Sequence, residues 1–161
     1  MKRTPFGPRK KPMKRTALSA TPKGERAKAK KKAWAMFSVF IRMRDSDANG
    51  MVKCVTCKRV AHWTKMDAGH FITRAKECTL MDERNVHAQC KGCNQFQGGK
   101  FFEHEKAVER IHGLGTVAEL KTLAGMTCKR TARDYFFLEG AFAALAKEQA
   151  EKYPGKARPG K

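Results

Sequence analysis

Apolar residues between residues 25 and 45 recur at three- and four-residue intervals, with polar and basic residues between them. The apolar stripe consists of Ala33, Trp34, Met36, Phe37, Phe40, Ile41 and Met43. This spacing is typical of an amphipathic helix that buries one face. The run Asp47-Ala48-Asn49-Gly50 is a turn signal, so we expect the helix to end near Asp45.

Between residues 51 and 90 the apolar segments become short, which favours strands and loops over helices. Val52, Val55 and Val60 predict short strands, and residues 63–72 predict a strand or hairpin limb. Residues 73–84 are polar and irregular, as expected of a loop.

Helical spacing returns towards the C-terminus. We expect a helix or turn from Asn94 that Gly98-Gly99 breaks, and then helices over about residues 103–112, 116–124 and 131–151. Short strands followed by helices predict one α+β domain over residues 25–152. The flanking segments, residues 1–24 and 153–161, are rich in Pro, Gly and basic residues, so we expect both tails to be disordered without a partner.

The net charge of +20 is concentrated near the N-terminus. Residues 1–32 hold 13 Lys or Arg and one acid, which gives +12, and the remaining 22 bases and 14 acids give +8. This distribution predicts a nucleic-acid partner. No membrane partner is expected, because no apolar stretch approaches the roughly 18 residues of a span and the run Lys28-Ala29-Lys30-Lys31-Lys32 has no apolar face.

Four of the six cysteines form two Cys-x-x-Cys pairs, Cys54 with Cys57 and Cys90 with Cys93. Two such pairs are the usual ligand set of one structural zinc ion, and a closed four-sulfur site leaves no open position for catalysis. This spacing and the lack of an apolar segment after the basic N-terminus favour reduced thiols in a cytoplasmic protein. Cys78 and Cys128 stand alone, and we interpret them as structural or incidental.

Polar residues between and beside these pairs could support hydrolysis of a phosphodiester. His70 could take a proton from water, and Asp67 and Asn94 offer oxygen ligands for magnesium or manganese. Asn85 could fix the intervening loop through its amide. Nearby basic residues could bind phosphates: Arg74, Lys76, Arg84 and Lys100.

The order of these motifs resembles the zinc-stapled HNH, or His-Me finger, endonucleases. It resembles more closely the lambdoid phage NinG (Rap) family, over about residues 39–124. The motifs that carry this resemblance are Phe40-Ile41-Arg42-Met43-Arg44-Asp45, Cys54-Val55-Thr56-Cys57, Asp67-Ala68-Gly69-His70, Glu83-Arg84-Asn85-Val86-His87 and Gln89-Cys90-Lys91-Gly92-Cys93-Asn94-Gln95.

The resemblance implies a zinc-bound ββα core and a phage recombination nuclease that cleaves branched DNA, such as Holliday junctions or D-loops, in the cytoplasm of the bacterial host. It implies His70 as general base, Asn85 as the middle HNH residue and Asn94 as ligand of the catalytic cation. Many HNH enzymes have an Asp or His ligand where this chain has Gly69, and Asp67, on the same strand face, is the candidate substitute. The reserve ligands are His87, Gln97 and His104. Cutting two strands would suit a homodimer.

Two other classes fit the charge and the cysteines. One is a non-catalytic zinc-finger protein that binds nucleic acid as a recombination mediator or regulator. The other is an RNA-binding protein of the ribosome-associated type. Neither explains the combination of His70, Asn85 and Asn94.

Overall fold

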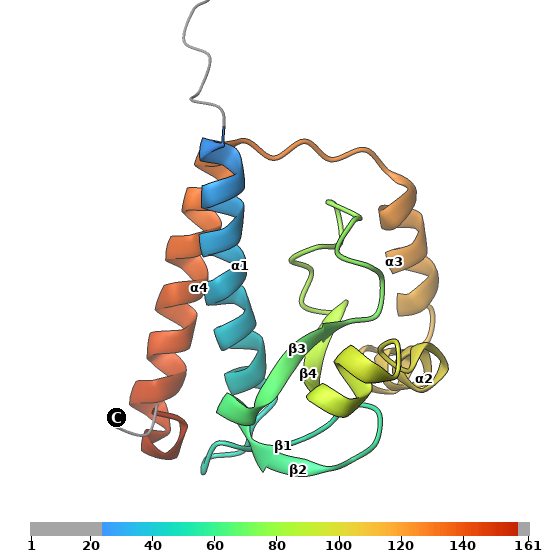
Figure 1. The fold of residues 1–161 in the computed structure, drawn as a ribbon, viewed down its shortest axis with the longest axis vertical. Helices are drawn as coiled ribbons and strands as arrows, with labels where there is room; N and C mark the ends of the chain where they lie inside the picture. The colour runs from blue at the N-terminus through green and yellow to red at the C-terminus, as the bar shows by residue number, and fades with distance from the viewer. Residues whose placement is uncertain (1–23, 158–161) are drawn as a thin grey trace, which may run out of the picture.

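The computed structural model describes residues 24–157, which form an α+β fold (Figure 1). The elements, in chain order, are helix α1 (Glu25–Arg44), strands β1 (Met51–Lys53) and β2 (Val60–His62), the 3-10 turn η1 (Trp63–Lys65), strands β3 (Met66–His70) and β4 (Val86–Cys90), the π-helical turn η2 (Gly92–Phe96), helices α2 (Phe101–His112), α3 (Thr116–Gly125) and α4 (Ala132–Lys152), and the 3-10 turn η3 (Pro154–Lys156). The predicted helices and the irregular segment at 73–84 are confirmed to within about two residues. The N-terminal arm, which we predicted to be disordered, lies outside the described residues except for Gly24.

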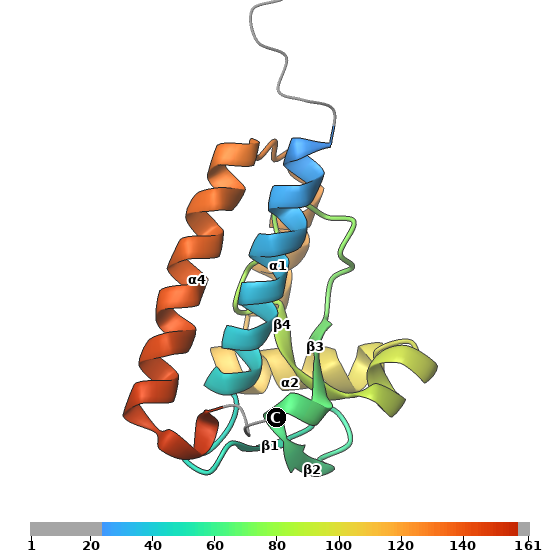
Figure 2. The same cartoon turned by 60° about the vertical axis from the view of Figure 1, so that its left-hand side comes forward.

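Helices α1 and α4 lie side by side as one layer, seen clearly in Figure 2. Their apolar stripes meet at Phe142, whose ring centroid is 4.7 Å from that of Phe37 and 5.8 Å from that of Phe40. A capping box starts α4, because the side chains of Thr131 and Asp134 each accept from the other's backbone amide.

The strands form two antiparallel hairpins, β1–β2 and β3–β4. In the second, Met66 pairs with Cys90, Asp67 with Gln89, Gly69 with His87 and His70 with Val86. Side chains alternate along a strand, so Ala68 and Val86 share the face that packs into the α1 core. The opposite face points towards η2 and α2, and the hairpin therefore lies between two helical layers.

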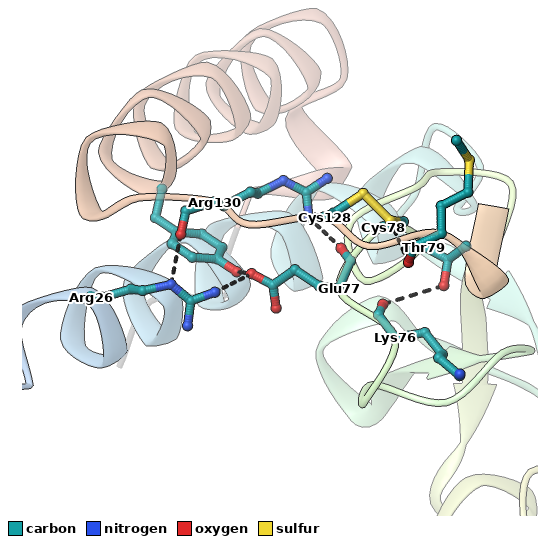
Figure 3. The surroundings of a disulfide bond; sticks show 9 residues. Arg26, Lys76, Glu77, Cys78, Thr79, Cys128 and Arg130 are labelled. Carbon is teal, nitrogen blue, oxygen red and sulfur yellow. Dashed lines mark hydrogen bonds and ion pairs between the residues drawn. A yellow bond between two sulfur atoms is a disulfide. The ribbon is translucent and has the colours of Figure 1, made fainter.

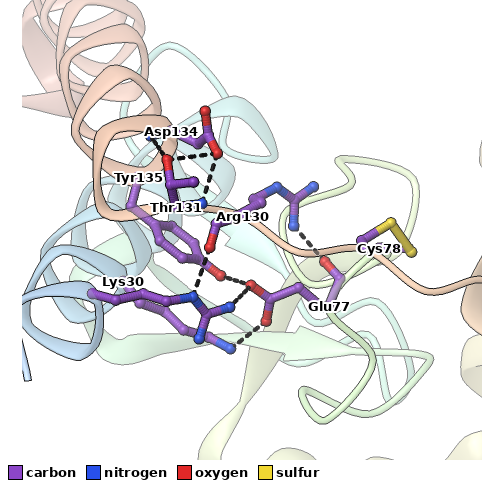
Figure 4. A network of polar contacts seen from close by, with 9 residues as sticks. Lys30, Glu77, Cys78, Arg130, Thr131, Asp134 and Tyr135 are labelled. Carbon is purple, nitrogen blue, oxygen red and sulfur yellow. Dashed lines mark hydrogen bonds and ion pairs between the residues drawn. A yellow bond between two sulfur atoms is a disulfide. The ribbon is translucent and has the colours of Figure 1, made fainter. Parts of the chain in front are cut away.

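The loop between β3 and β4 is fastened to the helix pair (Figures 3 and 4). The carboxylate of Glu77 accepts from Arg26 at 2.7 Å, from Lys30 at 2.6 Å and from the Tyr135 hydroxyl. The guanidinium of Arg130 donates to the Glu77 backbone carbonyl. These contacts join the loop to the N-terminal ends of both α1 and α4.

Cys78 and Cys128, which we interpreted as structural or incidental, are structural, but the expectation that they stand alone is wrong. They form a disulfide that joins the β3–β4 loop to the segment before α4, over a sequence separation of 50 residues (Figure 3). A single cysteine has no spacing signature, so the sequence pattern gave no sign of this pair. The expectation of reduced thiols therefore holds in this structure only for the other four cysteines.

The beginning of the predicted C-terminal tail is ordered. After α4, the chain turns back at η3, and the Trp63 indole donates to the Lys156 carbonyl at 2.9 Å. The Lys156 ammonium is buried and donates to the Met43 carbonyl and to Gln149, each at 2.9 Å. The predicted disorder is thus wrong for residues 153–157, while residues 158–161 lie outside the described part.

Candidate metal centre

The four cysteines of the two pairs converge on one point. All four sulfur atoms lie within 4.8 Å of one another, and the Sγ atoms of Cys57 and Cys90 are 3.7 Å apart. Tetrahedral zinc–sulfur bonds of about 2.3 Å place sulfur atoms roughly 3.8 Å apart. The donor set and its spacing fit a structural metal ion such as zinc.

Local backbone contacts assemble this cluster. Cys90 ends β4, and its amide donates to the Sγ of Cys54 at 3.3 Å. The Val55 amide donates to the Ala88 carbonyl at 3.0 Å, which holds the first pair against β4. Lys58, directly after that pair, has a positive φ of 64°, and its amide closes the turn onto the Cys54 carbonyl.

Asp67 and Asn94 are neighbours. Asn94, directly after the last cysteine, lies on η2, and its amide donates to Asp67 Oδ2 at 3.0 Å. The Gln95 amide donates to the same oxygen at 2.7 Å. The structure thus brings the two predicted cation ligands together beside the cysteine cluster.

His70 ends β3 and packs between strand and helix. Its Nε2 lies 3.0 Å from the Leu80 carbonyl, and its ring stacks on that of Trp34 in α1 with centroids 4.7 Å apart. A carbonyl only accepts, so Nε2 carries the proton and Nδ1 presents a lone pair. Burial, with a smaller contribution from the charge of Arg74, lowers the pKa of His70 to about 4, against the hydrogen bond to Leu80. The imidazole is therefore neutral at pH 7.

The fully buried Asn85 holds the loop that follows His70. Its Nδ2 donates to the carbonyls of Ile72 and Thr79, at 3.1 and 2.9 Å, and its Oδ1 accepts from the Ile72 amide at 2.6 Å. These bonds place the Leu80 carbonyl near His70 through the loop, which is the geometric task expected of this amide.

The predicted site residues form two groups rather than one. His70 hydrogen-bonds neither Asp67 nor Asn94 within the described residues. His70 and Asp67 are three residues apart in β3, so strand alternation directs them to opposite faces, about 10 Å apart along the chain. His70 faces α1, whereas Asp67 faces η2.

A buried histidine chain lies beyond Gly69. His87 Nδ1 is 3.3 Å from His104 Nε2, and His87 Nε2 is 2.9 Å from His112 Nε2. Burial and the neighbouring His104 lower the pKa of His87 to about 2, and burial lowers that of His104 to about 4. His87 and His104, two of the three reserve ligands, therefore contact each other. The sequence analysis missed His112, although it lies on the same helix as His104, eight residues further on.

A basic cavity of about 990 Å³ opens beside this chain, between the end of α1, the first cysteine pair and the end of α2. Its lining includes two histidines, His87 and His112, and the basic residues Arg44, Lys53, Lys58, Arg84 and Arg110. Arg44 and Arg84 have acidic partners. Lys53 and Arg110 form no ion pair within residues 24–157 and are available to an anion.

The other basic residues predicted to contact phosphates lie elsewhere. The Arg74 guanidinium stands over the Trp34 ring, 4.4 Å from its centroid, and so lies near His70. Lys100 precedes α2 with a positive φ of 49°. Lys76 is exposed in the loop between β3 and β4.

Together these features define a small α+β protein whose central hairpin is anchored by a four-cysteine cluster. The chain belongs to the family described as Bacteriophage Lambda NinG protein, whose family model matches residues 8–150. It is 38% identical over 96 residues to Protein ninG of Salmonella phage P22, which covers 57% of this chain and 43% of the relative. It is 37% identical over 91 residues to Protein ninG of Escherichia phage lambda, which covers 55% of this chain and 40% of the relative.

The chain therefore spans less than half the length of these relatives. No solved structure matches it. Among residues 24–157, no helix is both long and apolar enough to cross a bilayer.

Proposed function

We propose that this protein is a metal-dependent endonuclease of phage recombination that cleaves branched DNA, with a zinc ion in the four-cysteine cluster and an HNH-type ββα core. The observation that carries the proposal is the state of His70. Its Nε2 proton is committed to the Leu80 carbonyl, so the neutral ring offers Nδ1 as a base. Within residues 24–157, the hydrogen bond at Nε2 is the one hydrogen bond of the His70 ring.

The contacts around His70 give it the order that a general base requires. Trp34 holds the ring by stacking, and Asn85 fixes the loop that supplies the Leu80 carbonyl. In this proposal Nδ1 takes the proton of the attacking water, while Trp34 and Asn85 position the ring.

Asp67 and Asn94 are the proposed holders of the magnesium or manganese ion. Their oxygens are the ligands that such ions prefer, and the 3.0 Å contact already holds them together. When bound, the ion would neutralise charge that develops on the phosphate. Because His70 and Asp67 leave β3 on opposite faces, the proposal requires the scissile phosphate to span the end of the hairpin.

Charge supports DNA as the partner. The chain has a net charge of +20, and the basic cavity adds Lys53 and Arg110 as free cations within the folded part. The preference for branched DNA rests on the resemblance to the NinG (Rap) family alone. Action in the host cytoplasm rests on that resemblance and on the cysteine spacing, and a homodimer on the need to cut two strands.

The second candidate is a non-catalytic zinc-finger protein that binds nucleic acid in recombination. The separation of His70 from Asp67 and Asn94 favours it, because a preformed nuclease site would hold base and cation ligands on one side.

A cleavage assay separates the two candidates. Wild-type protein, His70→Ala and the control His62→Ala would be incubated with a four-way DNA junction, linear duplex and structured RNA, with and without magnesium. We expect magnesium-dependent junction cleavage that falls about 10²–10⁴-fold in His70→Ala, as is typical for loss of a general base, and persists in the control. Zinc content and junction affinity should not change. Junction cleavage by His70→Ala at the wild-type rate would refute the proposal, and binding without cleavage by the wild type would favour the zinc-finger alternative.

A further inference from the structure

The Gln89 side chain has an oxygen without a partner in the middle of the hairpin. Gln89 is fully buried in β4, and its Nε2 donates to the Gly99 carbonyl at 2.7 Å and to Thr56 Oγ1 at 3.2 Å. Its Oε1 accepts no hydrogen bond from the described residues. Since the Gly99 carbonyl can only accept, the amide cannot be reversed, and the unpaired atom is the oxygen.

This oxygen lies over Gly69 of the neighbouring strand. A Cβ atom at Gly69 would be 3.0 Å from Gln89 Cβ and closer still to Oε1. Gly69 therefore leaves the space that Oε1 occupies, which gives a steric reason for glycine there. Residues 67 and 69 share a strand face, and Gln89 lies directly opposite Asp67 in the register.

Oxygen donors therefore gather on this face of the hairpin. Directly opposed residues of an antiparallel pair have Cβ atoms about 4.5–5.5 Å apart, which puts the Gln89 amide and the Asp67 carboxylate within reach of one ion. Asn94 is already at Asp67. A carboxylate and two amide oxygens are hard ligands of the kind that magnesium and manganese take.

Burying a carbonyl without a hydrogen-bond donor is unfavourable, and the two hydrogen bonds at Nε2 hold this carbonyl in place. A buried oxygen that its neighbours fix without a partner points to a bound ligand. We propose that Gln89 Oε1 is a ligand of a divalent cation that binds between β3, β4 and η2, with Asp67 and Asn94 as the other protein ligands. This inference rests on the proposed function for the identity of the ion and adds a ligand from the strand opposite Asp67.

The inference is tested by measuring Mn²⁺ binding to the full zinc-loaded chain without DNA, by the loss of the electron paramagnetic resonance signal of free Mn²⁺. Gln89→Met keeps the length of the side chain and removes the oxygen, so we expect at least tenfold weaker binding. Gln89→Glu keeps an oxygen and adds charge, so we expect binding as tight as wild type or tighter. Glu148→Met is the control, because Glu148 is exposed on α4 and contacts neither Asp67 nor Asn94.

Wild-type affinity in Gln89→Met would overturn the inference, as would a wild type that does not take up Mn²⁺. If Gln89→Met loses its zinc and fails to fold, Gln89→Glu decides, and binding more than tenfold weaker than wild type in that variant would count against the role. Cleavage is measured separately. Weakened Mn²⁺ binding in Gln89→Met together with a wild type that does not cleave DNA would support the ligand role of Gln89 and refute the nuclease function. Normal Mn²⁺ binding and normal cleavage in Gln89→Met would refute the ligand role and leave the nuclease function supported.

Discussion

The indole ring of Trp34 stacks on the imidazole of His70 at a centroid distance of 4.7 Å and an interplanar angle of 25°. The contact joins helix α1 to the last residue of β3. It also covers one side of a ring whose pKa is lowered mainly by burial. The first prediction follows from this arrangement.

Trp34→Ala should raise the pKa of His70 from about 4 towards the ordinary 6.5, because water would reach the ring and stabilise its charged form. Trp34→Phe should raise it less, since a smaller ring still covers the imidazole. The measurement is an NMR titration of the His70 ring protons. An unchanged pKa in Trp34→Ala would mean that Trp34 does not control the burial of His70.

Stability should fall steeply in mild acid. His70 and His104 have folded-state pKa values of about 4, below the ordinary 6.5, so the unfolded chain binds protons that the folded chain does not. Their contribution to the free energy of unfolding is fully present above pH 6.5 and is lost as the pH falls towards 4. Because one pKa unit corresponds to about 1.4 kcal/mol, each histidine contributes on the order of 3 kcal/mol. Urea unfolding at several pH values would measure it. His104→Phe should reduce the dependence of the unfolding free energy on pH. An unchanged dependence in that variant would contradict the contribution assigned to His104.

Loss of the disulfide should destabilise the fold without loss of metal. Cys128→Ser should lower the free energy of unfolding by about 2–4 kcal/mol, the usual effect of one disulfide. A thiol reductant should lower the stability of the wild type to the same level and leave the variant unchanged. Zinc content should be the same throughout, because the metal uses the other four cysteines. Equal wild-type stability with and without reductant would show that the bond contributes nothing.

Removal of one cluster ligand should have a larger effect. Cys90→Ser should prevent folding of the core, because β4 ends at this residue and metal-binding energy is folding energy. Elemental analysis should find one zinc ion per wild-type chain and less in the variant. Wild-type protein without zinc, purified in the absence of chelator, would remove the premise.

Lys53 and Arg110 should contribute to DNA affinity through phosphate contacts. Replacing both with Ala should weaken binding to all DNA substrates by a similar factor and reduce the slope of log affinity against log salt by up to about 2. Replacing Lys121 of α3, which is exposed and pairs with Glu105 of α2, is the control and should change little. A selective loss of junction binding would instead assign these residues to substrate discrimination.

The sequence predicted most of the secondary structure because helical periodicity and turn residues are local signals. The apolar stripe from Ala33 to Met43 and the turn signal at Asp47 predicted the position and the end of helix α1 correctly. The Cys-x-x-Cys spacing likewise predicted a cluster that the structure assembles. These features depend on neighbours only a few residues apart.

Features that depend on distant partners were missed. The Cys78–Cys128 bond joins single cysteines 50 residues apart, and nothing in the local sequence marks the unpaired oxygen of Gln89. The separation of His70 from Asp67 could have been read from their odd spacing in one strand, once a continuous strand was assumed. The contact between Asp67 and Asn94 depends on how η2 folds back after the cysteines, which the spacing alone does not fix.

The turn η3 changes where the folded unit ends. The family match stops at residue 150, and helix α4 stops at Lys152. Lys156 nevertheless packs against the C-terminal ends of α1 and α4, where its carbonyl accepts from the Trp63 indole and its ammonium donates to the Met43 carbonyl. A protein shortened to the family boundary would lose a buried cation and leave the Trp63 indole without its acceptor. A minimal folded fragment should therefore extend at least to Ala157, because the buried contacts of Lys156 lie beyond the point where the family match ends.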